Sequence, residues 1–186
     1  MDMELGDLVI LDSGSSFIDA LVSAVYRITK TSPKVVRFPD LEIGKPENII
    51  FSGRAIASKL IDKWAFKLLN ITEGSRSLNI CYGAEALNLY RGGSLVKLPE
   101  SISGIRPVNF FEKNQLGITG EVRVFESRKY GIGRLGKGLR VIANGNGIEG
   151  FVDEESRRIG LMFHPERSGK DGDAILSSFL LLSQKL

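Results

Sequence analysis

The sequence predicts an α/β fold, a three-layer sandwich whose central sheet is mostly parallel. Up to about residue 90, short apolar runs alternate with segments whose apolar residues recur at helical spacing, and such alternation implies parallel strands joined by crossover helices. From Gly92 onward, glycines punctuate short alternating runs, which predicts a small antiparallel region in the C-terminal half. We therefore expect helices on both faces of one sheet.

Length and composition fit one ordinary globular domain that covers residues 1–186. The chain has a mass of 20.4 kDa, and its 42% hydrophobic and 25% charged residues are typical of a soluble protein. A chain of this size can bury a sizeable core but is short for two ordinary domains. No apolar run approaches the roughly 20 residues that a membrane helix needs, so we expect no contact with a membrane.

Charge and cysteine content narrow the class of protein further. The net charge of +3 is mild and the basic residues are scattered rather than striped, which argues against a nucleic-acid partner. The acidic start, Met1–Asp7, lacks the basic and then apolar plan of a signal peptide. The single cysteine cannot form an internal disulfide, which fits a reducing compartment. We expect a cytoplasmic protein.

The first predicted unit is a strand, a loop and a helix. Asp7–Asp12 is a continuous apolar run bounded by acids, as in a buried parallel strand, and apolar residues recur at helical spacing from Phe17 to Ile28. The small-residue turn between them, Ser13–Ser16, could cradle a phosphate, but it lacks the lysine of a P-loop and the glycine spacing of a dinucleotide fingerprint. We favour a capping loop.

Two further strands are predicted before residue 60. Pro33–Phe38 and Asn48–Phe51 are short and apolar, and the turn at Ser52-Gly53 leads into a predicted helix. Parallel sheets place their sites beyond the carboxyl ends of the strands, which is where Gly53 would fall. The predicted helix carries the apolar residues Ile56, Leu60, Trp64 and Leu68.

The segment Ser77–Tyr90 predicts a strand, a sharp turn and a helix around Cys81. A nucleophile at such an elbow is pushed out by strained backbone, and the flanking residues must be small, a requirement that Gly83 meets. The positive end of the following helix would favour the thiolate. A lone cysteine is more often a small buried hydrophobe, so its surroundings must decide its role.

The C-terminal half predicts short antiparallel strands and one helix. Glu121–Phe125 and Leu139–Ala143 read as strands, and 172–180 reads as a helix with its apolar face in the core. The glycine pairs are more often hairpin turns than phosphate loops. We therefore predict turns at Gly92-Gly93, Ser103-Gly104, Gly117, Gly131-Ile132-Gly133, Gly136-Lys137-Gly138 and Gly145-Asn146-Gly147.

The only histidine follows another strand-like run, in Arg158–Glu166. A cysteine nucleophile needs a base, and the base needs an acceptor that orients it. His164 and Glu166 stand two residues apart around a proline, so both could face the cleft that holds Cys81. Any Cys–His catalysis in this chain must use this pair.

Three segments, in the same order along the chain, resemble the motifs of class I glutamine amidotransferases. Glu47–Gly53 is similar to the family strand that ends in Ser-Gly-Gly, Asn79–Glu85 resembles the signature Gly-x-Cys-x-Gly-x-Gln, and Phe163–Glu166 resembles the His-Pro-Glu motif. The opening, Asp12–Phe17, is similar to that of anthranilate synthase glutaminases and, less closely, of GMP synthase glutaminases. The resemblance implies a flavodoxin-like sandwich.

The resemblance also implies a glutaminase that releases ammonia from glutamine through a Cys81 thioester. His164 would transfer protons, and Glu166 would orient its imidazole. The backbone N–H of Tyr82 and one from the Gly53–Arg54 turn would stabilise negative charge on the amide oxygen. No cofactor and no metal are implied.

The chain departs from the family pattern at several positions, including the segment Ser127–Tyr130, where related glutaminases carry a histidine. Glu85 occupies the position of the family glutamine that contacts substrate. We expect its carboxylate to bind the substrate by accepting hydrogen bonds from the ammonium group of glutamine. Asn79 and Arg54 occupy two positions at which the family has glycine. These departures leave open an alternative, a catalytically degenerate protein of this fold that regulates or scaffolds a synthase.

The expected partners are glutamine as substrate and a separate synthase subunit that accepts the ammonia. A chain of 186 residues leaves no room for a synthase domain beside the glutaminase. GMP synthase, anthranilate or aminodeoxychorismate synthase, and imidazole glycerol phosphate synthase partners look alike on this sequence, and the opening segment favours the first two.

Overall fold

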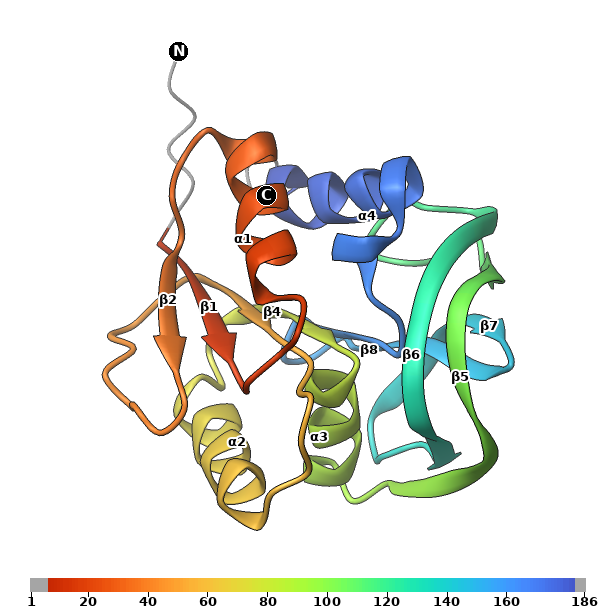
Figure 1. Cartoon of the computed structure of the whole chain (residues 1–186), viewed down its shortest axis with the longest axis horizontal. Helices are drawn as coiled ribbons and strands as arrows, with labels where there is room; N and C mark the ends of the chain where they lie inside the picture. The colour runs from red at the N-terminus through yellow and green to blue at the C-terminus, as the bar shows by residue number, and fades with distance from the viewer. Residues whose placement is uncertain (1–6, 183–186) are drawn as a thin grey trace.

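The computed structural model describes residues 7–182, which form one mixed sheet of nine strands in the order β2-β1-β3-β4-β9-β8-β7-β5-β6 (Figure 1). The signal-peptide prediction rests mainly on residues 1–6, which lie outside the described part of the chain. Among residues 7–182, no helix combines the length and the apolar character that crossing a membrane requires.

Five strands form the parallel half of the sheet and confirm the strands predicted from the apolar runs. β1 pairs with β2 and β3, β3 pairs with β4, and β4 pairs with β9, all in parallel. Every residue of β1, β3 and β9 is buried, as expected for strands covered on both faces. The five are β1 (Leu8–Asp12), β2 (Lys34–Arg37), β3 (Asn48–Phe51), β4 (Arg76–Ile80) and β9 (Arg158–Leu161).

Four helices cover the two faces of this half, which confirms the three layers. α1 (Ile18–Thr29) and α4 (Gly169–Leu182) share one hydrophobic cluster with one face of the sheet. α2 (Lys59–Ile71) and α3 (Tyr82–Tyr90) share a second cluster with the other face. Figure 1 shows the first pair above the sheet and the second pair below it.

Helix α2 begins later than the sequence pattern indicated. The Ser58 side chain accepts a hydrogen bond from the backbone N–H of Leu60 at 3.2 Å and caps the helix there. Ile56 therefore lies in the preceding loop with 75% of its surface exposed, and Leu60 is 65% exposed. Only the later apolar positions, including Trp64 and Leu68, pack in the core.

The antiparallel half is larger than predicted, so the expectation of a mostly parallel sheet is confirmed only in part. The sheet is mixed, because β9, β8, β7, β5 and β6 pair with antiparallel neighbours. β5 and β6 are 17 and 15 residues long and form the curved ribbon at the right of Figure 1. The four added strands are β5 (Ser94–Phe110), β6 (Gly120–Arg134), β7 (Leu139–Gly145) and β8 (Gly147–Asp153).

Two of the predicted glycine turns are wrong, since Gly104 lies inside β5 and Gly131–Gly133 inside β6. Gly133 serves a close approach instead: a Cβ there would lie 3.1 Å from the Oγ of Ser94 on the paired strand. The turn at Gly145-Asn146-Gly147 is confirmed as the β7–β8 connection, with Gly147 at a φ of +125° that glycine accepts readily.

Candidate active site

Cys81 stands between the end of β4 and the start of α3, in the predicted strand–turn–helix elbow. Its φ of +50° and ψ of −104° are strained for a residue with a side chain. Its N–H donates to the carbonyl of Leu161 at 2.7 Å, and its own carbonyl accepts from the N–H of Glu85 at 2.9 Å. These two bonds fix the strained backbone, and 6% of the cysteine's surface is exposed.

Gly83, two residues after the cysteine, must be small because strand β3 passes close to it. A Cβ on Gly83 would lie 2.7 Å from the carbonyl oxygen of Phe51, closer than such contacts allow. Asn79, two residues before the cysteine, is fully buried, and its amide donates to the Ser77 hydroxyl and to the Ile159 carbonyl. Bonds to its own strand and to β9 therefore accommodate the asparagine.

His164 follows β9 and is held from several sides. Its backbone N–H donates to the Phe125 carbonyl at 2.8 Å. The ring of Phe17 packs edge-on against the imidazole, with 4.9 Å between the ring centroids. The short 3₁₀ turn Pro165–Arg167 carries Glu166 back, so that Glu166 Oε1 lies 2.9 Å from His164 Nδ1. The predicted pairing of His164 with Glu166 is thus present, and the histidine is 3% exposed.

The pKa of His164 is raised to about 10. Burial alone would lower it, but hydrogen bonds to Cys81 and Glu166, together with the negative charges of these groups, outweigh the burial. The imidazole therefore holds its proton at neutral pH and can deliver it to a leaving group. Glu166 pairs directly with the imidazole, and Cys81 lines the same cavity as His164.

This raised pKa predicts a pH-dependent stability. A base whose pKa is higher in the folded state contributes stability that is complete below its unfolded value, near 6.5, and is lost as the pH rises through about 10. We expect the free energy of unfolding of the wild type to exceed that of His164→Asn most at pH 6, and the difference to shrink toward pH 10. Denaturant titrations of both proteins across this range measure it, and a constant difference would contradict the raised pKa.

Gly53 lies two residues after the end of β3 and closes the site from that side. A Cβ at this position would lie 3.0 Å from His164 Cε1 and 3.6 Å from Cys81 Cβ. Glycine is therefore needed for the close approach of three segments that are far apart in the sequence. The structure brings together Gly53, Cys81 and His164 at the carboxyl ends of β3, β4 and β9, as the parallel strands predicted.

Arg54 and Tyr82 are joined by Asp62, a residue that sequence reasoning missed. Arg54 Nη1 and the Tyr82 hydroxyl both donate to Asp62 Oδ1, at 2.6 and 2.8 Å, and the guanidinium lies 3.8 Å from the centroid of the tyrosine ring. Within residues 7–182, the backbone N–H groups of Arg54 and Tyr82 donate to no other group. One carboxylate thus holds two residues whose backbone donors are available.

Glu85 lies on α3 beside these groups and is buried. Burial raises the pKa of its carboxyl to about 7; the charges of Arg54 and Arg128 oppose this shift, and that of Asp62 adds to it. Near neutral pH, Glu85 therefore exchanges between an acid that can donate a hydrogen bond and a carboxylate that only accepts.

A cavity of about 350 Å³ opens above these residues. Cys81, Tyr82, Glu85, Arg54 and His164 line it together with two segments of the long ribbon, 101–103 of β5 and 127–130 of β6. Cys81 Sγ lies 3.7 Å from the carbonyl oxygen of Ser127. The contribution of β5 was not predicted, because only the folding of the ribbon over the parallel half brings it near the cysteine.

A buried ion group stiffens the wall formed by β6. The Arg128 guanidinium donates to Glu126 Oε2 at 3.0 Å and to Glu149 Oε1 at 2.6 Å, and all three side chains are buried. Burial raises the pKa of Glu149 to about 7, although the Arg128 charge opposes the shift. Because removing one member would leave buried charge uncompensated, this group fixes the position of Arg128 at the cavity.

The sequence model of the family described as glutamine amidotransferase class-I matches residues 9–182. The chain belongs to the class I glutamine amidotransferases. This membership assigns it to glutamine-dependent amidotransfer. No curated protein sequence matches the chain significantly.

Solved structures share the amidotransferase fold at low sequence identity. A Thermoplasma acidophilum protein described as belonging to a GMP synthase has 20% identity and a TM-score of 0.87, covering 98% of this chain and 96% of that chain. A glutamine amidotransferase from Thermotoga maritima has 17% identity and a TM-score of 0.75, covering 96% and 84%. One from Methylobacillus flagellatus has 16% identity and a TM-score of 0.65, covering 87% and 70%.

The candidate site offers acid–base and nucleophilic groups. Among the described residues, no three or more His, Cys, Asp or Glu side chains are grouped so as to hold a metal ion. The reactive groups at the cavity are a thiol, an imidazole paired with a carboxylate, and backbone donors. Such a set can perform acyl transfer.

Proposed function

We propose that this chain is a glutaminase that hydrolyses glutamine to glutamate and ammonia through a Cys81 thioester and supplies the ammonia to a separate synthase subunit. The observation that carries the proposal is that Cys81 and His164 line one cavity, while Glu166 Oε1 lies 2.9 Å from His164 Nδ1. A cysteine nucleophile, a base and an orienting acceptor are the three groups that this reaction needs.

The reaction follows from these groups in two steps. The Cys81 sulfur attacks the side-chain amide carbon of glutamine, and the protonated His164 gives its proton to the leaving nitrogen, which departs as ammonia. A water molecule then attacks the thioester carbon while His164 accepts its proton, and the sulfur leaves. Glu166 holds the imidazole in one orientation throughout. The products are glutamate and ammonia.

Negative charge develops on the amide oxygen in both steps and needs fixed donors. The backbone N–H of Tyr82 and one from the Gly53–Arg54 turn fill this role in the proposal, because both segments border Cys81 and the N–H groups of Tyr82 and Arg54 make no other bond within residues 7–182. Losing such a donor typically costs about 10²–10³ in rate.

Asp62 acts in this scheme as a positioning residue for both donors. We expect Asp62→Ala to lower kcat about tenfold, because Arg54 and Tyr82 lose their common anchor and the donors lose their alignment. KM for glutamine should change little, since Asp62 does not line the cavity. Asp62→Asn keeps an acceptor oxygen and should recover most of the rate. Equal loss in both variants, or loss only in KM, would contradict this role.

Glu85 recognises the substrate in the proposal, and the protonation state of its carboxyl sets the affinity for glutamine. If only the protonated acid can donate to glutamine, as an amide would, raising the pH from about 6 to about 8 through the pKa near 7 should raise KM about tenfold. Steady-state kinetics with Glu85→Gln should show a KM that does not vary over this range. A wild-type KM that falls with pH would instead support the expectation from the sequence, in which the Glu85 carboxylate accepts hydrogen bonds from the substrate ammonium.

A separate synthase as the ammonia acceptor is supported by the similarity to the Thermoplasma acidophilum protein, which is described as one subunit of its synthase. Copurification from the source cells, followed by glutamine-dependent ammonia release with and without each candidate synthase, tests both halves of the proposal. Ammonia release by the chain, alone or with a partner, is the expected result.

The degenerate alternative has an observation in its favour: Arg54 and Glu85 replace a glycine and a glutamine of the family pattern at the cavity. A chain that binds a synthase but releases no ammonia in any combination would establish the regulatory or scaffolding function in place of the enzyme.

A further inference from the structure

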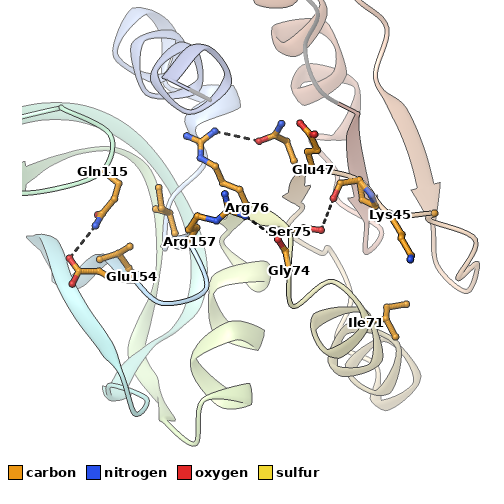
Figure 2. Close-up of a pocket in the computed structure, with 14 residues that line it drawn as sticks. Lys45, Glu47, Ile71, Gly74, Ser75, Arg76, Gln115, Glu154 and Arg157 are labelled. Atoms are coloured by element: carbon orange, nitrogen blue, oxygen red, sulfur yellow. Dashed lines mark hydrogen bonds between the residues drawn. The ribbon is translucent and has the colours of Figure 1, made fainter. Parts of the chain in front are cut away.

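A second and larger cavity, of about 950 Å³, lies at the opposite edge of the parallel strands. Asn48 and Arg76, the first residues of β3 and β4, line it, whereas Cys81 follows the last residue of β4. The two cavities share no lining residue. Figure 2 shows Arg76 and Arg157 between Gln115 and Glu154 on one side and Lys45 and Glu47 on the other.

Uncharged acceptors hold the two arginines of this cavity. Arg76 Nη1 donates to the Phe179 carbonyl at 2.6 Å and to Asn48 Oδ1 at 3.4 Å, and its guanidinium lies 4.2 Å from the centroid of the phenylalanine ring. Arg157 Nη2 donates to the Gly74 carbonyl at 3.1 Å. Each guanidinium has five N–H donors, so most of them stay available to a ligand.

These two cations have no carboxylate partner in the described part of the chain. No ion pair among residues 7–182 includes Arg76, Arg157 or Lys45. Burial and then repulsion from the Arg157 charge lower the pKa of Arg76. Two like charges held near each other without a counterion stabilise a bound anion.

The backbone of Arg157 has a conformation that is unusual for an arginine. Its φ of +55° lies in the left-handed region, which glycine and asparagine adopt at less cost. The β8–β9 connection alone therefore does not favour an arginine here.

The remaining walls fit an organic molecule rather than a bare ion. The carboxylate of Glu154 is already engaged by Arg140 and Gln115, so it does not oppose an anion strongly. Apolar side chains of Ile71, Val152 and Ile159 line the same cavity. A volume of this size lies within the range of about 300–1,000 Å³ that small-molecule sites occupy.

We propose that this cavity is a second binding site, for a phosphate monoester of about mononucleotide size whose phosphate binds Arg76 and Arg157. A phosphate dianion matches two guanidinium charges and accepts forked hydrogen bonds from each. The apolar wall takes the organic part of the ligand, and Glu47 and Lys45 at the rim can bond its hydroxyl groups. The site does not depend on the proposed glutaminase reaction.

Calorimetric titration of the full chain with adenosine monophosphate, adenosine and inorganic phosphate tests the proposal. We expect saturable binding of adenosine monophosphate, competition by inorganic phosphate, and no binding of adenosine. Arg157→Gln removes one charge at an exposed position and should weaken binding at least about tenfold. Arg76→Gln should do the same, and its thermal unfolding should be checked because Arg76 also bonds Phe179.

Arg106→Gln is the matched control, because Arg106 is also exposed and its Nη1 likewise donates only to a backbone carbonyl, that of Ile105. It should bind adenosine monophosphate as the wild type does. The proposal is overturned if no binding is detected at millimolar concentration, if adenosine binds as tightly as its monophosphate, if citrate binds more tightly, or if Arg157→Gln leaves the affinity unchanged. Since binding is measured directly, these outcomes do not depend on whether glutamine is hydrolysed.

Discussion

Cys81→Ala is expected to lower the rate of glutamine hydrolysis by on the order of 10⁴ or more, because the sulfur is the attacking atom and no other group at the cavity replaces it. His164→Ala should cost a similar factor, since the imidazole holds the proton that the leaving nitrogen needs. The double variant should be no slower than either single one, because the two groups act as a unit. Ammonia release measured in all three proteins gives the comparison.

Labelling of the thiol provides a control that does not depend on turnover. A glutamine-analogue electrophile should modify Cys81 in the wild type, and glutamine should protect it. Thermal unfolding should show that Cys81→Ala remains folded, because the change removes one sulfur atom at the edge of the core. Labelling at the rate of an ordinary peptide cysteine, unaffected by glutamine, would contradict the nucleophile assignment.

Gly53→Ala is expected to lower kcat about 100-fold, because the added Cβ would lie 3.0 Å from His164 Cε1 and must displace the imidazole from Cys81. The substitution adds one methyl group in a confined place and leaves the chemical groups intact. Its effect therefore measures how much the reaction depends on the position of the histidine.

Gly133→Ala is the matched control for this prediction. Its Cβ would lie 3.1 Å from Ser94 Oγ, a contact as crowded as that at Gly53 but located in the β5–β6 ribbon outside the cavity lining. It should lower stability somewhat and leave kcat unchanged. If Gly53→Ala turned over glutamine as fast as Gly133→Ala, the close approach of Gly53 and His164 would have no catalytic role.

Local patterns were enough to predict the parallel half of the fold. The strands β1, β3 and β4 were found from short apolar runs, because strands covered by helices on both faces leave little room for polar residues. The boundary of α2 and the glycines within β5 and β6 were predicted wrongly. A cap at Ser58 and a close approach between paired strands depend on partners that no local window contains.

The sequence by itself determined where the reactive side chains stand along the chain. Cys81 falls at a strand–helix junction and His164 stands two residues from Glu166, and both features depend on a few consecutive residues. Because parallel strands end at the same edge of a sheet, these segments could be expected to meet there. The elbow and the pairing of His164 with Glu166 are both present in the structure.

Only the tertiary structure decided the surroundings of these side chains. The anchoring of Arg54 and Tyr82 by Asp62, the burial that raises the pKa of Glu85, and the β5 residues that line the cavity with Cys81 bring together α2, α3, β5 and the loop after β3. Burial and electrostatic shifts depend on the sum of all neighbours in space, whereas a sequence pattern records only neighbours along the chain.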